Sequence, residues 1–168
     1  MKENPTFTDI LTTLAKAKIK FLVAGGIAMN LHGLQRSTMD LDLIVFLKKE
    51  NVLKFVKTIT KLGFRPKVPV PAESFADEEL RKQWIQEKNM VVFSFYHSKN
   101  MMNVIDVFVE HPRPFEEMFK NKKTMAIGKN RIHAVGLEDM LYLKNKANRP
   151  KDEFDIRFLK SILHKKRD

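Results

Sequence analysis

The sequence predicts an α/β chain, of the α+β kind, in which a mixed sheet is flanked by helices and followed by C-terminal helices. Short apolar runs at Phe21–Ala24 and Leu43–Phe46 alternate with segments of helical periodicity. Two later apolar runs, near residues 90–96 and 104–109, are separated by a short polar turn, which is typical of antiparallel strands. This order of elements favours one sheet covered by helices.

In the first half of the chain, apolar spacing of three and four residues marks helices, and short apolar runs mark strands. Gly33 and Gly63 follow two of the helical segments, where glycine commonly ends a helix. Residues 34–39 are expected to be a polar connection. The expected helices are 6–18, 26 to about 32 and 48–62, and the expected strands are 21–24, 41–47 and a proline-interrupted 64–70.

The second half begins with a polar, charged stretch, residues 72–89, which is expected to form a helix over the sheet edge or a mobile lid. Strands and a hairpin follow, and then two helices separated by Asn148-Arg149-Pro150. The expected elements are strands 90–96 and 104–109, a helical turn at 115–119, a hairpin of 124–127 and 131–135, and helices 137–147 and 152–163.

The length of 168 residues suits a single domain, 1–168, with its core at about 19–110 and a C-terminal helical part at about 136–165. The chain has no cysteine, which excludes a disulfide framework and a thiolate metal site. No apolar run is long enough to cross a bilayer. The default expectation is therefore a cytoplasmic protein with no membrane partner.

The formal net charge of +11 is unevenly distributed. Residues 1–119 contain 17 Lys and Arg against 14 Asp and Glu, whereas residues 120–168 contain 14 against 6. The C-terminal part therefore attracts phosphates or nucleic acid, although a solvated basic surface that aids solubility explains the excess equally well.

The main chemical signal lies where Gly25-Gly26 ends an apolar strand and Asp40-Leu41-Asp42 begins the next. Glycines at the end of a strand let backbone N–H groups approach a phosphate closely. Side chains two residues apart in a strand point the same way, so Asp40 and Asp42 can converge on the same cations.

A third carboxylate, Asp106, lies in a later apolar strand, in phase with Val104 and Phe108. Two Mg²⁺ ions held by such carboxylates can neutralise a triphosphate and position a nucleophile. Asp106 could also accept the proton of the attacking hydroxyl. Taken singly, Asp40 could be a turn residue, and Asp42 and Asp106 could each pair with a lysine.

Further catalytic signatures are missing from the sequence. There is no P-loop and no Gly-x-Ser-x-Gly elbow, and the five histidines have no metal-site spacing. The three acids behind the glycine pair remain the strongest indication of chemistry.

The pattern of apolar strand, Gly-Gly, Asp-x-Asp and a distant strand Asp resembles the DNA polymerase β-type nucleotidyltransferase superfamily. Within it, the chain looks most similar to the minimal AbiEii-like and MNT-like nucleotidyltransferases of toxin–antitoxin systems. The motifs that carry the likeness are 26–33 after the glycines, 36–42 as Arg-x-Thr-x-Asp-x-Asp, and a C-terminal signature of 137–144 and 149–155. The likeness runs from about residue 19 to 160 and is weak between 64 and 89.

The resemblance implies a mixed-sheet nucleotidyltransferase fold and a role for each matching residue. Gly25 and Gly26 would cradle the triphosphate, and Asp40 and Asp42 would hold Mg²⁺. Asp106 would be the third metal-binding and catalytic acid, and its presence favours activity over a degenerate site.

Three further residues are predicted to bind the nucleotide. Arg36 and Thr38 would contact phosphate or support Asp40, with loop solvation and a turn hydroxyl as the alternatives. Lys144 falls on the apolar stripe of its helix, so its ammonium must reach a phosphate, a buried acid such as Asp155, or solvent. Asp152 is expected to cap the last helix.

The expected function is transfer of a nucleoside monophosphate from an NTP, such as ATP, to a hydroxyl, with a two-ion Mg²⁺ site. The acceptor could be a protein, a tRNA or a small molecule, and a cognate toxin–antitoxin partner is a further candidate. The alternatives are a non-catalytic nucleotide- or RNA-binding module of such a pair, and a metal-dependent phosphohydrolase that uses the same acids.

Overall fold

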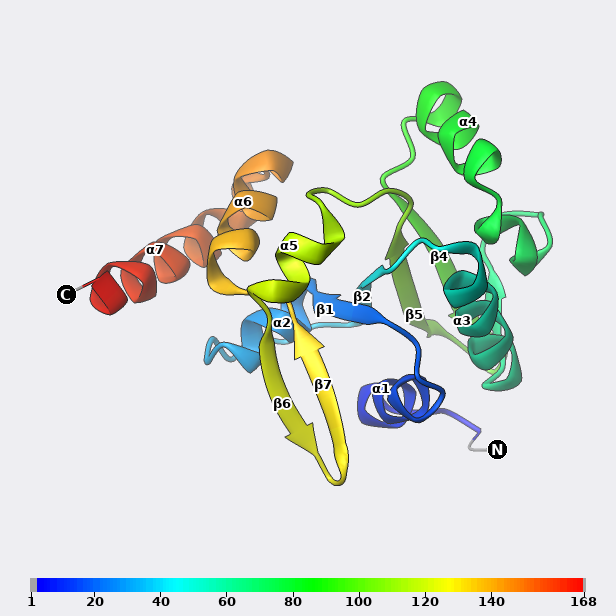
Figure 1. Cartoon of the computed structure of the whole chain (residues 1–168), viewed down its shortest axis with the longest axis horizontal. Helices are drawn as coiled ribbons and strands as arrows, with labels where there is room; N and C mark the ends of the chain where they lie inside the picture. Colours follow the sequence, from blue (N-terminus) through cyan, green and yellow to red (C-terminus); the bar gives the residue numbers. More distant parts are fainter. Residues whose placement is uncertain (1–2, 168) are drawn as a thin grey trace.

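A seven-stranded mixed sheet of order β3-β4-β5-β2-β1-β7-β6 forms the centre of the computed structural model, which describes residues 3–167 (Figure 1). The fold class predicted from the sequence is therefore confirmed. The strands are β1 (Phe21–Ala24), β2 (Asp40–Val45), β3 (Phe64–Pro66), β4 (Val92–His97), β5 (Asn100–Phe108), β6 (Lys123–Ile127) and β7 (Asn130–Ala134).

Helices precede, link and follow these strands. They are α1 (Phe7–Lys16), α2 (Gly25–Leu31), α3 (Lys49–Lys61), α4 (Glu78–Lys88), α5 (Phe115–Lys120), α6 (Leu137–Ala147) and α7 (Glu153–Arg167), with short 3₁₀ turns η1 (Ala72–Ala76) and η2 (Pro150–Asp152). Among residues 3–167, no helix is both long and apolar enough to span a membrane.

One face of the sheet is mainly apolar and is covered by α1 and α3. Leu41, Leu43 and Phe95 point to this face and are completely buried, and Phe55 of α3 meets Phe95 edge to face, with ring centroids 6.1 Å apart. The alternation of a strand sends the residues between them to the opposite face. Asp40, Asp42 and Ser94 therefore share the second, less covered face.

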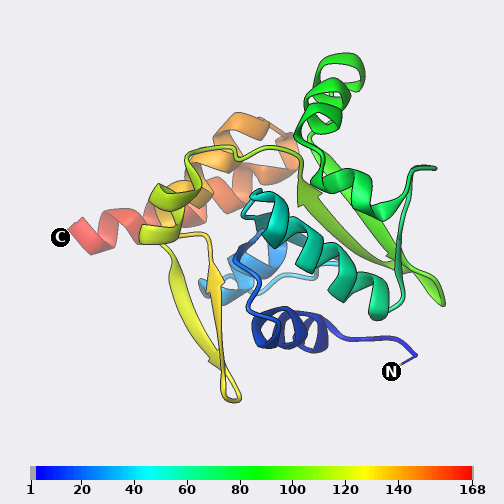
Figure 2. The same cartoon turned by 45° about the vertical axis from the view of Figure 1, so that its right-hand side comes forward.

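The 72–89 segment forms the short turn η1 and the helix α4 at the sheet edge. A helix at this edge is one of the two predicted alternatives. The stretch divides at Asp77, whose side chain accepts a hydrogen bond from the Leu80 N–H and caps α4. Trp84 anchors the helix by stacking on Phe93, with ring centroids 5.1 Å apart. The rest of α4 extends away from the sheet (Figure 2).

Two predicted boundaries differ from the structure for local reasons. The expected strand 64–70 pairs over Phe64–Pro66 and adds one hydrogen bond from the Lys67 N–H to the Ser94 carbonyl, at 2.9 Å. Pro69 beyond it lacks the N–H group that a longer ladder needs. The expected turn between the strands 90–96 and 104–109 narrows to Ser98 and Lys99, since β4 ends at His97 and β5 already begins at Asn100.

Candidate active site

The three predicted carboxylates lie together on one face of neighbouring strands. β2 pairs in parallel with β5, and in this register Asp42 lies directly opposite Asp106. On its other side, Asp42 lies opposite Ala24, the last residue of β1. Asp40 precedes Asp42 by two residues, so the sheet places all three acids on the same surface.

Mutual repulsion and partial burial disfavour the ionised forms of two of these acids. Burial, then Asp106, then Asp40 raise the pKa of Asp42 from 3.8 to about 6, and Lys144 and Arg149 oppose the shift. Burial and Asp106 also raise the pKa of Asp40, against the field of Lys67 and Lys151. The carboxylates thus form a local excess of negative charge that a cation would relieve.

Ser94 is a further polar residue of this face, and it was not predicted from the sequence. It lies opposite Asp106 on β4, and its hydroxyl donates a hydrogen bond to Asp106 Oδ1. A signal for it was present, because Ser94 stands between the buried Phe93 and Phe95 and so must point away from the core. Only strand pairing shows that it meets Asp106.

Gly25 lies directly against Asp42. Its φ of +60° is left-handed, and a Cβ built on it would stand 2.0 Å from Asp42 Oδ2. Gly26 packs in the same way against Thr38, since a Cβ there would stand 2.7 Å from the Thr38 hydroxyl oxygen. The Thr38 hydroxyl in turn donates to the Asp40 backbone carbonyl, with the oxygens 3.2 Å apart. The glycine pair therefore allows the backbone to approach the carboxylate strand.

Gly25→Ala is expected to destabilise the fold by about 2 kcal/mol or more and to displace the Asp42 carboxylate. Gly128→Ala is the matched control, because Gly128 has the same φ of +60° and no atom within 4 Å of a built Cβ. Urea unfolding of both variants separates backbone strain from the clash. An equal loss of stability in the two would contradict the close approach of Gly25 to Asp42.

Arg36 and Lys144, two of the predicted nucleotide-binding residues, both pair with Asp155. Lys144 is 7% exposed, and its Nζ lies 2.9 Å from Asp155 Oδ2 and 3.1 Å from Asp152 Oδ1. Arg36 forms an ion pair and hydrogen bond with Asp155 Oδ2. Contact of Arg36 and Lys144 with a nucleotide stays a prediction, while the pairing of Lys144 with a buried acid is confirmed.

Asp152 does not cap α7 but belongs to this buried network. It lies within η2, and Arg149 Nε donates to its Oδ2 at 2.7 Å. Burial alone would raise the pKa of Asp152, but hydrogen bonds from Arg149 and Lys144 outweigh it and hold the pKa below its ordinary value. The five charges of Arg36, Lys144, Arg149, Asp152 and Asp155 join α6 and α7 to the segment before β2.

The carboxylates do not form a closed metal site by themselves. Within residues 3–167, no three His, Cys, Asp or Glu side chains are grouped to hold a metal ion. Two hollows, of about 240 and 590 Å³, also lie elsewhere, beside β1 and β7 and beside α3 and η1. Mg²⁺ usually binds through one or two carboxylates together with substrate phosphates. The oxygen donors and mutual repulsion of Asp40 and Asp42 fit that kind of site.

The mixed sheet brings a glycine pair to two carboxylates on one strand and a third on the next, which is the arrangement expected of a nucleotidyltransferase. Residues 83–167, about half of the chain, match the family described as "Nucleotidyl transferase of unknown function (DUF2204)". The chain belongs to this family. The match includes Ser94, Asp106 and Lys144. It begins at residue 83, so the earlier segment with Asp40 and Asp42 lies outside it. No curated protein sequence matches the chain.

Solved structures show the same fold. The lincosamide antibiotic adenylyltransferase LnuA, bound to lincomycin, aligns with a TM-score of 0.61 and 18% identity over 95% of this chain and 99% of its own. ANT(2")-Ia in complex with adenylyl-2"-tobramycin aligns with a TM-score of 0.55 and 14% identity over 92% and 85%. A solution structure of the antibiotic-resistance factor ANT(2'')-Ia gives 0.54 and 12% over 93% and 83%. At these identities the likeness concerns the fold.

Proposed function

We propose that this protein transfers a nucleoside monophosphate from an NTP to a hydroxyl acceptor and releases pyrophosphate. The observation that carries this proposal is the strand register that sets Asp42 opposite Asp106 with Asp40 on the same face. Membership of a nucleotidyltransferase family supports it.

Asp40, Asp42 and Asp106 are the residues that would hold Mg²⁺. Bound Mg²⁺ would neutralise the triphosphate and stabilise charge that develops as the α–β phosphate bond breaks. The raised pKa of Asp42, about 6, means that the carboxylate must lose its proton before it can serve as a ligand.

Asp106 is also the residue proposed to accept the acceptor's proton. The hydroxyl oxygen bonds to the α-phosphorus, the bond to the β-phosphate oxygen breaks, and the hydroxyl proton passes to the Asp106 carboxylate. Since Ser94 already donates to Asp106 Oδ1, the second oxygen, Oδ2, is the one available to take it. Ser94 would thereby orient the base.

Positively charged side chains near the three acids could balance the negative charge of a bound triphosphate. Lys67 and Lys151, both exposed, act on Asp40, and Lys144 and Arg149 act on Asp42. In this arrangement the carboxylates take the metal and the surrounding cations face the phosphate oxygens. The backbone N–H groups of Gly25 and Gly26 are proposed to reach the same triphosphate.

Two solved structures of similar fold suggest a donor and an acceptor to test. LnuA is an adenylyltransferase of a lincosamide antibiotic, and ANT(2")-Ia was solved with an adenylylated tobramycin, which makes ATP the first donor to test and a small-molecule hydroxyl one candidate acceptor. A protein side chain and a tRNA end are the others. We also propose a cognate toxin–antitoxin partner, as in the AbiEii-like and MNT-like groups.

The test uses α-³²P-labelled NTPs with Mg²⁺ and separate pools of small hydroxyl compounds, tRNA and protein. Label in an acceptor together with pyrophosphate is the expected result. NTP binding without any product would favour the binding module, and free NMP without an acceptor would favour the phosphohydrolase. Mass spectrometry of the labelled pool identifies the acceptor.

Ser94→Ala is expected to lower kcat for transfer about tenfold while leaving the KM for NTP unchanged, because it loosens Asp106 as the base and leaves Asp40 and Asp42 in place. Ser94→Thr keeps the hydroxyl and is expected to restore most of the rate. A rate for Ser94→Ala equal to that of the unaltered protein would show that the hydrogen bond to Asp106 has no role in the reaction.

A further inference from the structure

The β6–β7 hairpin is a basic projection at the edge of the sheet. Residues 118–137 contain five Lys and Arg and no Asp or Glu. Figures 1 and 2 both show the hairpin extending beyond the body of the molecule, far from α4. Its exposed cations are Lys123, Lys129 and Arg131, and Lys122 is partly buried at its base.

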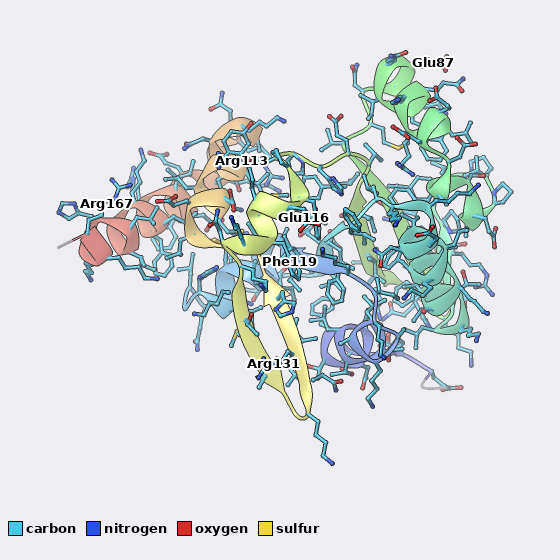
Figure 3. All side chains as sticks on the ribbon, viewed as in Figure 1. Glu87, Arg113, Glu116, Phe119, Arg131 and Arg167 are labelled. Atoms are coloured by element: carbon cyan, nitrogen blue, oxygen red, sulfur yellow. The ribbon has the colours of Figure 1, made fainter. Side chains whose placement is uncertain are left out.

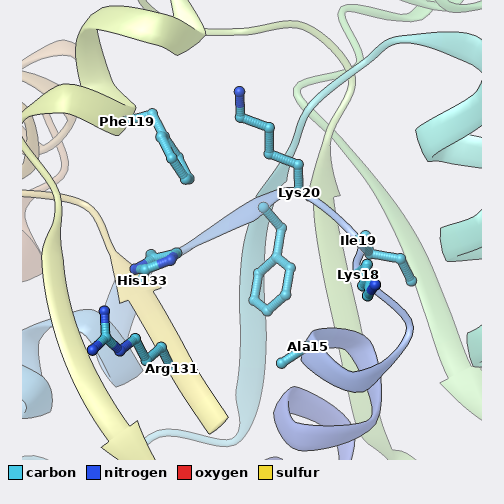
Figure 4. Close-up of a pocket in the computed structure, with 8 residues that line it drawn as sticks. Ala15, Lys18, Ile19, Lys20, Phe119, Arg131 and His133 are labelled. Atoms are coloured by element: carbon cyan, nitrogen blue, oxygen red, sulfur yellow. The ribbon is translucent and has the colours of Figure 1, made fainter.

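A hollow of about 240 Å³ lies beside this hairpin and continues its positive charge (Figure 4). Lys18, Lys20 and Arg131 supply its cations, from the end of α1, the residue before β1 and the hairpin. Its aromatic walls come from Phe119 and His133. A cationic, partly aromatic hollow has the chemistry to take a phosphate with its sugar or base.

Phe119 and its neighbours hold the cations of this region close together. Lys20 Nζ lies 4.8 Å from the centre of the Phe119 ring, and Lys122 Nζ lies 4.2 Å from it. Glu116 pairs with Lys20 at 2.9 Å but is itself largely exposed. Figure 3 shows Glu116 and Phe119 on α5 above the hairpin that carries Arg131. The exposed Glu116 therefore offsets the charge of Lys20.

Two histidines, His133 within β7 and His32 at the end of α2, lie within the positive field of these cations. Burial, then Lys122 and Arg131, lower the pKa of His133. Burial lowers the pKa of His32 against a hydrogen bond to the Val135 carbonyl, and Lys123 and Lys166 lower it further. Lys166 near the end of α7 thus acts on the same histidine as Lys123 of the hairpin.

Two other roles could explain exposed cations here, namely protection of an edge strand and membrane binding. Neither explains the whole basic surface. Lysines on an edge strand discourage pairing with another chain, which explains Lys123 on β6 but not Lys18 and Arg131 around a hollow. A membrane-binding surface would expose apolar side chains, yet none of the exposed large apolar residues of the described chain lies on the hairpin.

The surface is separate from the carboxylates. Phe21, which lines the hollow, pairs with Val45, while Ala24 pairs with Asp42. None of Asp40, Asp42 and Asp106 is among the residues that line the hollow. Binding at the hairpin can therefore be measured independently of transfer.

We propose that the β6–β7 hairpin and the hollow beside it bind single-stranded nucleic acid, with the phosphodiester backbone along the hairpin cations and one nucleotide in the hollow. The proposal does not depend on the proposed transfer reaction.

The test is fluorescence anisotropy of the full chain with a labelled oligouridine, at salt concentrations between about 50 and 200 mM. The affinity of the unaltered protein should fall as salt rises. The triple variant Lys122→Glu, Lys129→Glu, Arg131→Glu should bind at least about tenfold more weakly and lower the salt slope by about 2, the value for three lost contacts to a single strand.

The matched control is Lys57→Glu, Lys61→Glu, Lys88→Glu, which makes the same change in net charge at exposed positions on α3 and α4. The control should retain binding, and circular dichroism should show both triple variants folded. A triple Gln version of the hairpin variant gives a milder change if the Glu version does not fold.

Three results would overturn the proposal. They are no binding of oligouridine by the unaltered protein, an equal loss of affinity in the control, and equally tight binding of a duplex or of polyglutamate. The first two results would show that the hairpin is not a nucleic-acid-binding surface. The third would show that its ligand is not specifically single-stranded nucleic acid.

Discussion

Asp42→Asn is expected to abolish Mg²⁺-dependent NTP binding and to lower transfer by about a thousandfold or more, which corresponds to several kcal/mol of charge stabilisation. Asp42 is the acid that the sheet places between Ala24 and Asp106, so its oxygens lie at the centre of the group. Isothermal titration with ATP and Mg²⁺, together with the labelled transfer assay, measures both effects. Binding at full strength would contradict the metal role of Asp42.

The same substitution is expected to stabilise the metal-free protein at high pH. The folded pKa of Asp42, about 6, lies above its ordinary 3.8, so the contribution of this group to stability is complete below about pH 4 and is lost as pH rises through 6. Asparagine removes that loss, which amounts to roughly 1–2 kcal/mol once solvent screening is allowed for.

Urea unfolding without metal therefore has a defined outcome at two pH values. At pH 8 Asp42→Asn should be more stable than the unaltered protein, and at pH 4 the two should be nearly equal. A variant that is less stable at pH 8 would show that the ionised carboxylate is compensated within the fold. If Asp42→Asn is more stable than the unaltered protein and also fails to bind NTP, then Asp42 serves function at a cost to the stability of the fold.

Lys144→Met is expected to destabilise the protein by about 3 kcal/mol, because it leaves the buried carboxylates of Asp152 and Asp155 without their shared cation. Methionine keeps the length and much of the volume of the side chain, so the loss is mainly one of charge. Urea unfolding at pH 7 measures it. The variant should also raise the pKa of Asp42 further, since Lys144 opposes the existing shift.

Lys146→Met is the control, since Lys146 lies on the same helix and is exposed. Its effect should stay within about 0.5 kcal/mol of the unaltered protein. If Lys144→Met were equally mild, the buried network would contribute no more than a surface ion pair. If it kept its stability but lost NTP binding, the predicted nucleotide contact of Lys144 would be the better account.

Much of the fold follows from local patterns. The periodicity of residues 48–62 and the apolar run around β2 predict α3 and the strand correctly, because a residue's neighbours three, four or two positions away decide which face is apolar. The Asp40-x-Asp42 spacing likewise places two carboxylates on one side of a strand. The strand predicted at 64–70 was too long, because local apolar content does not show how far a strand pairs with its neighbour β4.

Local spacing and composition were enough to establish the residue types of the candidate site, the shared face of Asp40 and Asp42, and the excess of positive charge after residue 120. Strand pairing and helix packing were needed to place Asp106 opposite Asp42, Ser94 opposite Asp106, and Lys144 between Asp152 and Asp155. The strand contacts join segments distant in the chain, and the register between such segments depends on how the whole sheet and its helices pack. No short-range spacing encodes that register.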